Sequence, residues 1–246
     1  MIFRQFLHTN PVAISYFAAC GTHAAAAIVD AIGDIGPYLR VAEEAGTRIR
    51  YVVDTHLHAD HVSAGRALAE AAGAEYVLFA EAAASFPFRG VRDGEVLELG
   101  NTLMKVLHIP GHTPEHISLV VTDLKRGDEP WFALTGHTLM VGDLGRTELA
   151  TSAEEGARAL FRSARRLKTL PDHLEVFPGA YSGSVCGRSL SGKPMSTIGF
   201  ERRHNKAFAI DDEAAFVRTM LADIPPAPPQ AAQIRAANSG MMAAAE

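Results

Sequence analysis

Apolar positions follow two different patterns along the chain, and each pattern predicts its own arrangement of elements. The first eighty residues combine short apolar runs with two stretches of helical spacing. These two stretches, residues 34–45 and 62–72, are predicted helices, and each is followed directly by a glycine, as is typical after a helix. The apolar runs predict strands over residues 14–19, 27–31, 48–54 and 75–80.

After residue 90 the apolar runs follow one another with turns and no helix between them. They predict strands over residues 94–99, 102–108, 117–122 and 131–135. Residues 152–168 form the longest helical pattern, with glutamates in the first turn and basic residues in the last, which suits the helix dipole. A further strand over 174–177 and a helix over 211–222 are expected. The predicted fold class is therefore α/β (α+β), with strands in two groups and helices mostly outside them.

The last part of the chain changes in composition. Residues 179–199 are rich in glycine and serine and predict an ordered loop, whereas prolines interrupt the pattern at 225–229. The segment that follows is rich in alanine, glycine and glutamine, which favours disorder. We expect a single domain over residues 1–224 and a disordered tail over residues 225–246.

Composition narrows the class of protein. The chain has 246 residues, of which 48% are hydrophobic and 21% charged, and this is enough for one large core. A net charge of −5 argues against a nucleic-acid surface. The sequence has no membrane span and no secretory signal, and its two cysteines are too few for a disulfide framework, so a cytoplasmic location is expected.

A histidine cluster follows the predicted strand at 48–54. Residues 55–61 read Thr-His-Leu-His-Ala-Asp-His, so His56, His58, Asp60 and His61 lie within six positions. Imidazole and carboxylate are metal ligands, and loops after rigid strands are common places for sites. An extended chain would separate His61 from the others, whereas a turn would let all four converge. A histidine-rich solvated loop is the alternative.

Two later histidines lie at similar places. His112 stands in a Pro-Gly-His turn after a strand, and His137 follows the strand 131–135, so both are candidate metal ligands. His116 is expected to be structural because it leads into the next strand. Asp143, Arg146 and Glu148 lie in the segment Gly-Asp-Leu-Gly-Arg-Thr-Glu, where they either orient the ligands or form a local ion pair that holds the loop.

These motifs, in this order and spacing, resemble the metallo-β-lactamase superfamily, and most closely its branch of persulfide dioxygenases and glyoxalase II-type thioesterases. The resemblance covers residues 14–208 and implies a four-layer αββα sandwich with the site at the strand ends between the sheets. It also implies that His56, His58 and His112 hold a first metal and that Asp60 and His61 form half of a second site.

Two positions depart from the family pattern. His137 stands where the family has an aspartate, and Ala180 stands where the family has its last histidine. The second site then keeps only Asp60 and His61, too few ligands to hold a metal firmly. We expect one divalent metal per chain, with Fe(II) favoured and Zn(II) as the alternative. Asp60 and His61 are the candidate catalytic residues.

The resemblance implies chemistry on a small-molecule thiol or persulfide such as glutathione persulfide. The leading hypothesis is a mononuclear dioxygenase with iron held by His56, His112 and His137. The alternatives are a metal-dependent thioester hydrolase, in which Asp60 serves as base, and a non-catalytic protein that binds a sulfur metabolite.

The glycine-rich loop supplies the candidate substrate-binding residues. Tyr181, Cys186 and Arg188 are near Ala180 in the sequence, although a buried structural role is the alternative for Cys186. No nucleic-acid or membrane partner is expected, and a homodimer stays an open alternative to a monomer.

Overall fold

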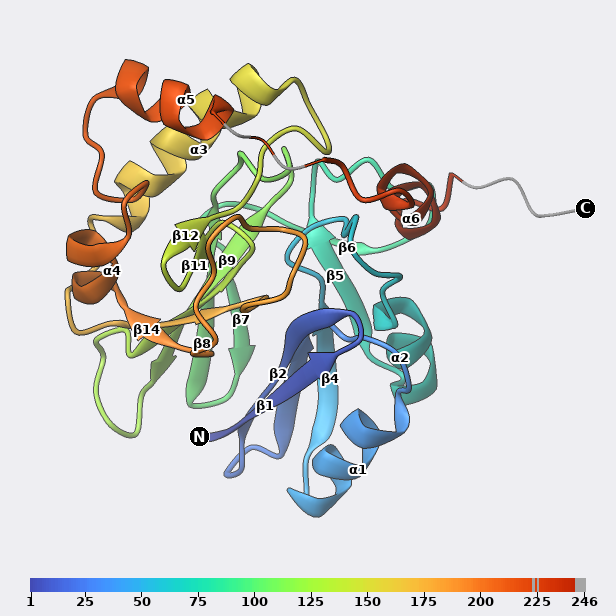
Figure 1. Ribbon diagram of the computed structural model, residues 1–246. Helices are drawn as coiled ribbons and strands as arrows, with labels where there is room; N and C mark the ends of the chain where they lie inside the picture. Colours follow the sequence, from blue (N-terminus) through green and yellow to red (C-terminus); the bar gives the residue numbers. More distant parts are fainter. Residues whose placement is uncertain (223, 225, 242–246) are drawn as a thin grey trace, which may run out of the picture.

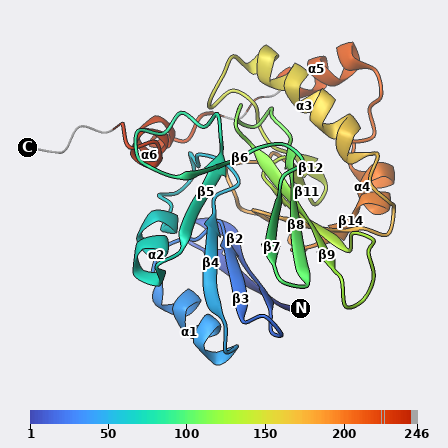
Figure 2. The ribbon, with the colours of Figure 1, turned by 180° about the vertical axis from the view of Figure 1, so that it is seen from behind.

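The centre of the molecule consists of two six-stranded sheets that face each other, with helices on both outer faces (Figures 1 and 2). The computed structural model describes residues 1–222, 224 and 226–241. The helices α1 and α2 lie beside the first sheet, and α3, α4 and α5 lie beside the second.

The first sheet carries its strands in sequence order. The strands β1 to β3 are antiparallel, whereas β3 to β6 are parallel and need crossovers, two of which contain helices. Parallel strands end at the same edge of a sheet, so the loops after β3 and β4 lie close together. The elements are β1 (Ile2–Thr9), β2 (Val12–Cys20), β3 (Ala25–Val29), α1 (Gly36–Glu44), β4 (Arg48–Val53), α2 (Gly65–Ala72), β5 (Glu75–Phe79) and β6 (Arg89–Val91).

The second sheet has the order β14-β13-β10-β9-β8-β7 and is antiparallel except between β10 and β13, which α3 connects. A short hairpin of β11 and β12 follows β10. The elements are β7 (Val96–Leu99), β8 (Thr102–His108), β9 (Ile117–Asp123), β10 (Phe132–Gly136), β11 (Leu139–Met140), β12 (Asp143–Leu144), α3 (Ala153–Leu167), β13 (Glu175–Pro178), β14 (Ser196–Thr197), α4 (Ile198–His204), α5 (Glu213–Leu221) and α6 (Ala231–Asn238).

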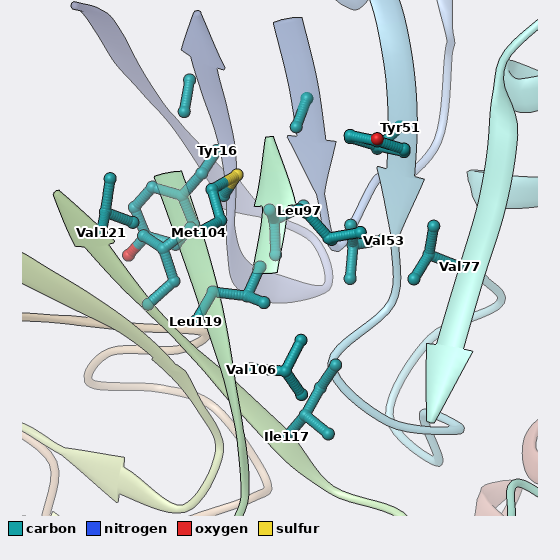
Figure 3. Close-up of a cluster of buried hydrophobic side chains, with 14 of the residues drawn as sticks. Tyr16, Tyr51, Val53, Val77, Leu97, Met104, Val106, Ile117, Leu119 and Val121 are labelled. Atoms are coloured by element: carbon teal, nitrogen blue, oxygen red, sulfur yellow. The ribbon is translucent and has the colours of Figure 1, made fainter. Parts of the chain in front are cut away.

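Three apolar clusters fill the spaces between these layers and join them. The central cluster lies between the sheets, where Val53 and Val77 of the first sheet meet Leu97, Val106 and Leu119 of the second (Figure 3). A second cluster joins the outer face of the first sheet to α1 and α2, and a third joins the outer face of the second sheet to α3 and α5. The predicted four-layer αββα sandwich is confirmed.

The apolar pattern predicted the strands and helices that build the core, and it missed others. The edge strand β1 has only partly buried and exposed positions and carries no continuous apolar run. The helix α4 begins at Ile198, inside the segment that was expected to be a loop. No helix in the described part of the chain is long and apolar enough to cross a membrane.

The C-terminal segment differs from its prediction. Residues 231–238 form α6, which packs at the loop ends of the first sheet, so the expectation of disorder is wrong there (Figure 1). The part of that expectation that concerns residues 225 and 242–246 lies outside the described residues. Hydrogen bonds from α6 to the histidine loop, described below, explain why this alanine-rich segment is ordered.

Candidate metal centre

The predicted ligands lie in loops that follow strand ends between the two sheets. The loop after β4 carries His56, His58, Asp60 and His61, and the strands β8 and β10 lead to His112 and His137. All six side chains are buried. The histidine loop therefore turns inward, and the alternative of a solvated loop is excluded.

Two ligand groups form from these residues. One ring nitrogen each of His56, His112 and His137 lie within 4.8 Å of one another. His58, Asp60 and His61 form a second group at the same spacing. The imidazole rings of His56 and His58 join the groups, because their centroids are 4.1 Å apart.

The donor atoms in these groups lack partners in the described part of the chain. Nε2 of His56, Nδ1 of His58, both oxygens of Asp60 and both ring nitrogens of His61 and His137 are buried without a hydrogen bond. Buried polar atoms are rarely left unpaired because each costs about 1–3 kcal/mol. A divalent cation would satisfy them, so the residues present fit a metal.

Hydrogen bonds to the other ring nitrogens orient the ligands. His112 donates from Nδ1 to the carbonyl oxygen of Arg146 at 2.7 Å, which directs Nε2 toward His56 and His137. Nδ1 of His56 lies 2.9 Å from Oγ1 of Thr55. Nε2 of His58 lies 3.1 Å from Oδ1 of Asp30, and this leaves Nδ1 of His58 as the ligand atom.

Burial determines the protonation of the three-histidine group. Burial and the charge of His58 hold the pKa of His56 well below its ordinary value. Burial and the charge of His137 lower the pKa of His112 to about 3, and burial also lowers the pKa of His137. All three imidazoles are therefore neutral near pH 7, which is the form that binds a metal.

The neighbouring group carries opposite charges. Burial alone would lower the pKa of His58, but the carboxylates of Asp30 and Asp60 outweigh it and raise this pKa well above its ordinary value. Burial alone would raise the pKa of Asp60, but the imidazoles of His61 and His137 hold it well below its usual range. Asp60 is therefore a buried carboxylate beside a cationic His58.

The predicted loop residues Asp143 and Arg146 act in different ways, Asp143 through its carboxylate and Arg146 through both its side chain and its carbonyl. The Asp143 carboxylate accepts hydrogen bonds from the N–H groups of Leu144, Arg188 and Ser189. The Arg146 side chain pairs with Glu148, as the local ion-pair alternative predicts. The carbonyl of Arg146 orients His112, so this residue also contributes to ligand orientation, through its backbone.

The three residues predicted to bind substrate lie at different places. Cys186 is buried in a group with Asp60 and His137, with ligand atoms within 4.8 Å. Tyr181 instead donates its hydroxyl to the carbonyl of His8. The Arg188 guanidinium lies 3.2 Å from Asp143 and donates to the carbonyl of Thr219, so it is held by α5 and the β12 loop. Contact of Tyr181 and Arg188 with a substrate stays a prediction.

Sequence reasoning missed four residues that hold the histidine loop. Asp30 accepts hydrogen bonds from Thr55, Glu115 accepts one from the N–H group of Leu57, and both acidic residues are buried. Arg235 and Asn238 of α6 donate to carbonyls of the loop. The one signal in the sequence is Asp30, a carboxylate at the end of the apolar run 27–31.

A cavity of about 270 Å³ reaches Asp60 from the surface. Its walls come from the β1–β2 turn and the loop after β13, so a small molecule that enters it meets the metal groups from the side of Asp60. The lining residues are Thr9, Asn10, Pro11, Val12, Asp60, Gly183, Ser184 and Val185.

Comparison with curated proteins finds two kinds of enzyme. The chain is 33% identical to a hydroxyacylglutathione hydrolase of Methylococcus capsulatus over 64% of this chain and 57% of that one. It is 25% identical to the mitochondrial persulfide dioxygenase ETHE1 of Homo sapiens over 89% of this chain and 80% of that one. The chain spans about three fifths of the length of the first curated relatives it matches.

A solved structure and a family model cover the same fold. A metallo-beta-lactamase from Staphylococcus aureus subsp. aureus COL superposes with a TM-score of 0.93 and 35% identity, over 100% of this chain and 74% of that chain. The model of the metallo-beta-lactamase superfamily matches residues 15–179, which include every histidine of both ligand groups. The chain belongs to the metallo-beta-lactamase superfamily.

Proposed function

We propose that this chain is a mononuclear metal-dependent enzyme of persulfide dioxygenase type that acts on a glutathione-like persulfide. The observation that carries the proposal is the convergence of three neutral imidazoles, from His56, His112 and His137, within 4.8 Å. The loop after β13 carries Ala180, at the position where the family resemblance leads us to expect a histidine, and alanine offers no ligand to the second group. A single metal at the three-histidine group is the simplest occupancy.

One of the curated relatives supports a dioxygenase. The relative named as a persulfide dioxygenase aligns with 89% of this chain, whereas the hydrolase relative aligns with 64%. Iron(II) is the metal we favour because, when bound, it supplies the redox chemistry with dioxygen that zinc lacks.

The residues around the centre would bind and orient the substrate. Asp60 is anionic and lines the cavity, so it can accept a hydrogen bond from the S–H group of a persulfide that enters there. Nδ1 of His61 lies 3.1 Å from Oδ1 of Asp60 and helps to hold this carboxylate in place. The buried walls exclude bulk water from the three-histidine group, which protects a reactive sulfur species from hydrolysis.

A hydrolase of thioesters is the second candidate, because Asp60 could also serve as a general base. Its carboxylate is ionised, and neither oxygen has a hydrogen bond in the described part of the chain. Zinc(II), when bound, would supply a water of lowered pKa for this reaction. The hydroxyacylglutathione hydrolase relative supports this candidate.

Metal analysis of anaerobically purified protein, together with oxygen consumption on glutathione persulfide, separates these candidates. One iron per chain with oxygen uptake supports the dioxygenase. Zinc with cleavage of a glutathione thioester overturns it in favour of the hydrolase, and metal binding without either activity indicates a protein that only binds sulfur metabolites. The His112→Ala variant should lose metal and activity, whereas His173→Ala, which changes an exposed histidine, should keep both.

A further inference from the structure

Cys186 lies against the metal centre although the proposed dioxygenase does not use it. Its ligand atom lies within 4.8 Å of those of Asp60 and His137. The residue is 1% exposed and forms no disulfide. A reduced thiol is therefore enclosed with a carboxylate and an imidazole.

Asp60 and His137, the other two members of this group, independently indicate a ligand. Both carboxylate oxygens of Asp60 and both ring nitrogens of His137 lack hydrogen bonds within the described residues. Their side chains are 3% and 1% exposed. Nε2 of His137 and Oδ2 of Asp60 are 4.0 Å apart, beyond hydrogen-bond distance. Two ligand atoms about 2.1 Å from one tetrahedral ion lie about 3.4 Å apart, so the two side chains need to close by about half an ångström to bind it together.

The backbone holds Cys186 in this place. The N–H group of Arg146 donates to the carbonyl of Cys186 at 3.1 Å, and the carbonyl of the same arginine orients His112. The N–H group of Cys186 donates to Oγ of Ser184. One short segment therefore positions both the thiol and a histidine of the first group, so the site is preorganised.

We propose that Asp60, His137 and Cys186 form a thiolate-containing site for a borderline or soft divalent cation such as Zn²⁺. Carboxylate oxygen, imidazole nitrogen and thiolate sulfur are the ligand types of tetrahedral zinc sites, with water as a fourth ligand. Cys186 lies on the loop that also carries Ala180, so the loop offers a sulfur ligand six residues after the alanine. The thiol releases its proton to solvent when the cation binds.

This site goes beyond the proposed function but is not independent of it. His137 belongs to both the three-histidine group and the thiolate group. A cation at the thiolate site therefore competes for His137, and excess Zn²⁺ should reduce iron loading. The inference about the ligands stands whether the chain is a dioxygenase or a hydrolase.

Cobalt(II) titration of the anaerobic metal-free protein tests the site. We expect a near-ultraviolet thiolate-to-cobalt charge-transfer band in the wild type that is lost in Cys186→Ser. The matched control is Cys20→Ser, which removes the other buried cysteine and should keep the band. Cys20 pairs with Ala25 at the start of β3, whereas Asp30 follows the opposite end of this strand. No band in the wild type, or an equal band in Cys186→Ser, overturns the proposal.

Two further measurements separate this proposal from protein misfolding and from the proposed function. Cadmium-113 NMR of the wild type needs no variant: a resonance shifted downfield by a sulfur ligand supports the site, and resonances of only nitrogen and oxygen ligands overturn it. His56→Ala disables the three-histidine group and should keep the cobalt band while losing dioxygenase activity. Loss of the band in this variant would overturn a separate thiolate site.

Discussion

At the scale of single residues, Asp30 does most to fix the metal loop. It stands directly after β3 with a φ of 54°, and its carboxylate is buried. One oxygen accepts from the N–H group of Thr55 at 2.7 Å and lies 3.1 Å from Nε2 of His58, and the other accepts from Oγ1 of Thr55. Asp30 therefore positions the start of the histidine loop and selects Nδ1 of His58 as the ligand atom.

Replacement of Asp30 by asparagine should weaken metal binding. An amide can keep one hydrogen bond to Thr55 but loses the charge that holds His58, and partners of this kind contribute about 10–100-fold to metal affinity. Competition with a chelator measures the change. The control is Asp128→Asn, the same change at an exposed position. Equal affinities for both variants would show that Asp30 has only a structural role.

His137 is the position at which the chemistry of the centre can be changed by one residue. His137→Asp gives the group two histidines and one carboxylate, the set that non-haem iron oxygenases use. We expect higher iron content and faster oxygen uptake with glutathione persulfide than in the wild type. His137→Asn is the matched control without the charge. Unchanged metal content and no gain in His137→Asp would contradict the placement of His137 as a ligand.

The motifs predicted the ligand residues but not the partners that orient them. His56, His112 and His137 were identified because imidazoles after strands stand out in the sequence. Asp30 is 26 positions before His56, and Arg146 acts through a carbonyl that every residue possesses. Such contacts depend on the folded path of the backbone, so residue types alone do not predict them.

At the scale of elements, α6 holds the histidine loop in place through side-chain hydrogen bonds. Nδ2 of Asn238 donates to the carbonyls of His58 and His61 at 2.9 and 2.8 Å, and Oδ1 of the same side chain accepts from the N–H group of Ser63. Arg235 donates to the carbonyl of Leu57 and pairs with a buried carboxylate, that of Glu115. The last described helix therefore completes a site that is formed mainly by the loops of the sandwich.

Loss of the hydrogen bonds from Asn238 should make the histidine loop more mobile. Asn238→Ala leaves two buried carbonyls and one N–H group without partners, which costs about 1–3 kcal/mol for each group that water cannot reach. We expect lower free energy of unfolding and faster metal release to a chelator. Gln233→Ala, on an exposed position of α6, is the control. Metal release at the wild-type rate from Asn238→Ala would contradict the role of α6 in holding the histidine loop.

The composition of residues 225–246 did not allow α6 to be predicted. An alanine-rich segment of eight residues is too short to be a stable helix alone, so disorder was a reasonable prediction. The stability of α6 comes from Arg235 and Asn238, whose partners lie about 180 positions earlier. Tertiary contacts of this separation are not visible in composition or periodicity.

At the scale of the whole molecule, the sandwich buries three neutral imidazoles between its sheets, and this arrangement lowers stability at low pH. The apolar pattern and the resemblance together predicted the layers, because buried runs such as residues 48–54 must lie in a core. The protonation of the buried histidines could not be predicted, because it depends on burial and on charges from distant loops. In the metal-free protein, the protonation of these histidines makes the free energy of unfolding depend on pH.

Acidification should destabilise the metal-free protein from about pH 6.5 downward. In the folded state burial keeps His56, His112 and His137 neutral, with the pKa of His112 at about 3, whereas in the unfolded chain each accepts a proton at about pH 6.5. The unfolded state therefore binds more protons, and the free energy of unfolding falls by up to about 1.4 kcal/mol per pH unit for each such group. His58 does not offset this, because its raised pKa leaves it protonated in both states below about pH 6.5.

Urea unfolding of the metal-free protein between about pH 6.5 and 5 measures this slope. His112→Gln removes one of the groups, so its free energy of unfolding should fall less steeply with acid, by about 1.4 kcal/mol per pH unit at most. His173→Ala should keep the wild-type slope, because that histidine is exposed. A wild-type slope near zero would mean that the buried imidazoles gain protons in the folded state as readily as in the unfolded one. The three-histidine group would then be open to water and protons, contrary to its place between the sheets.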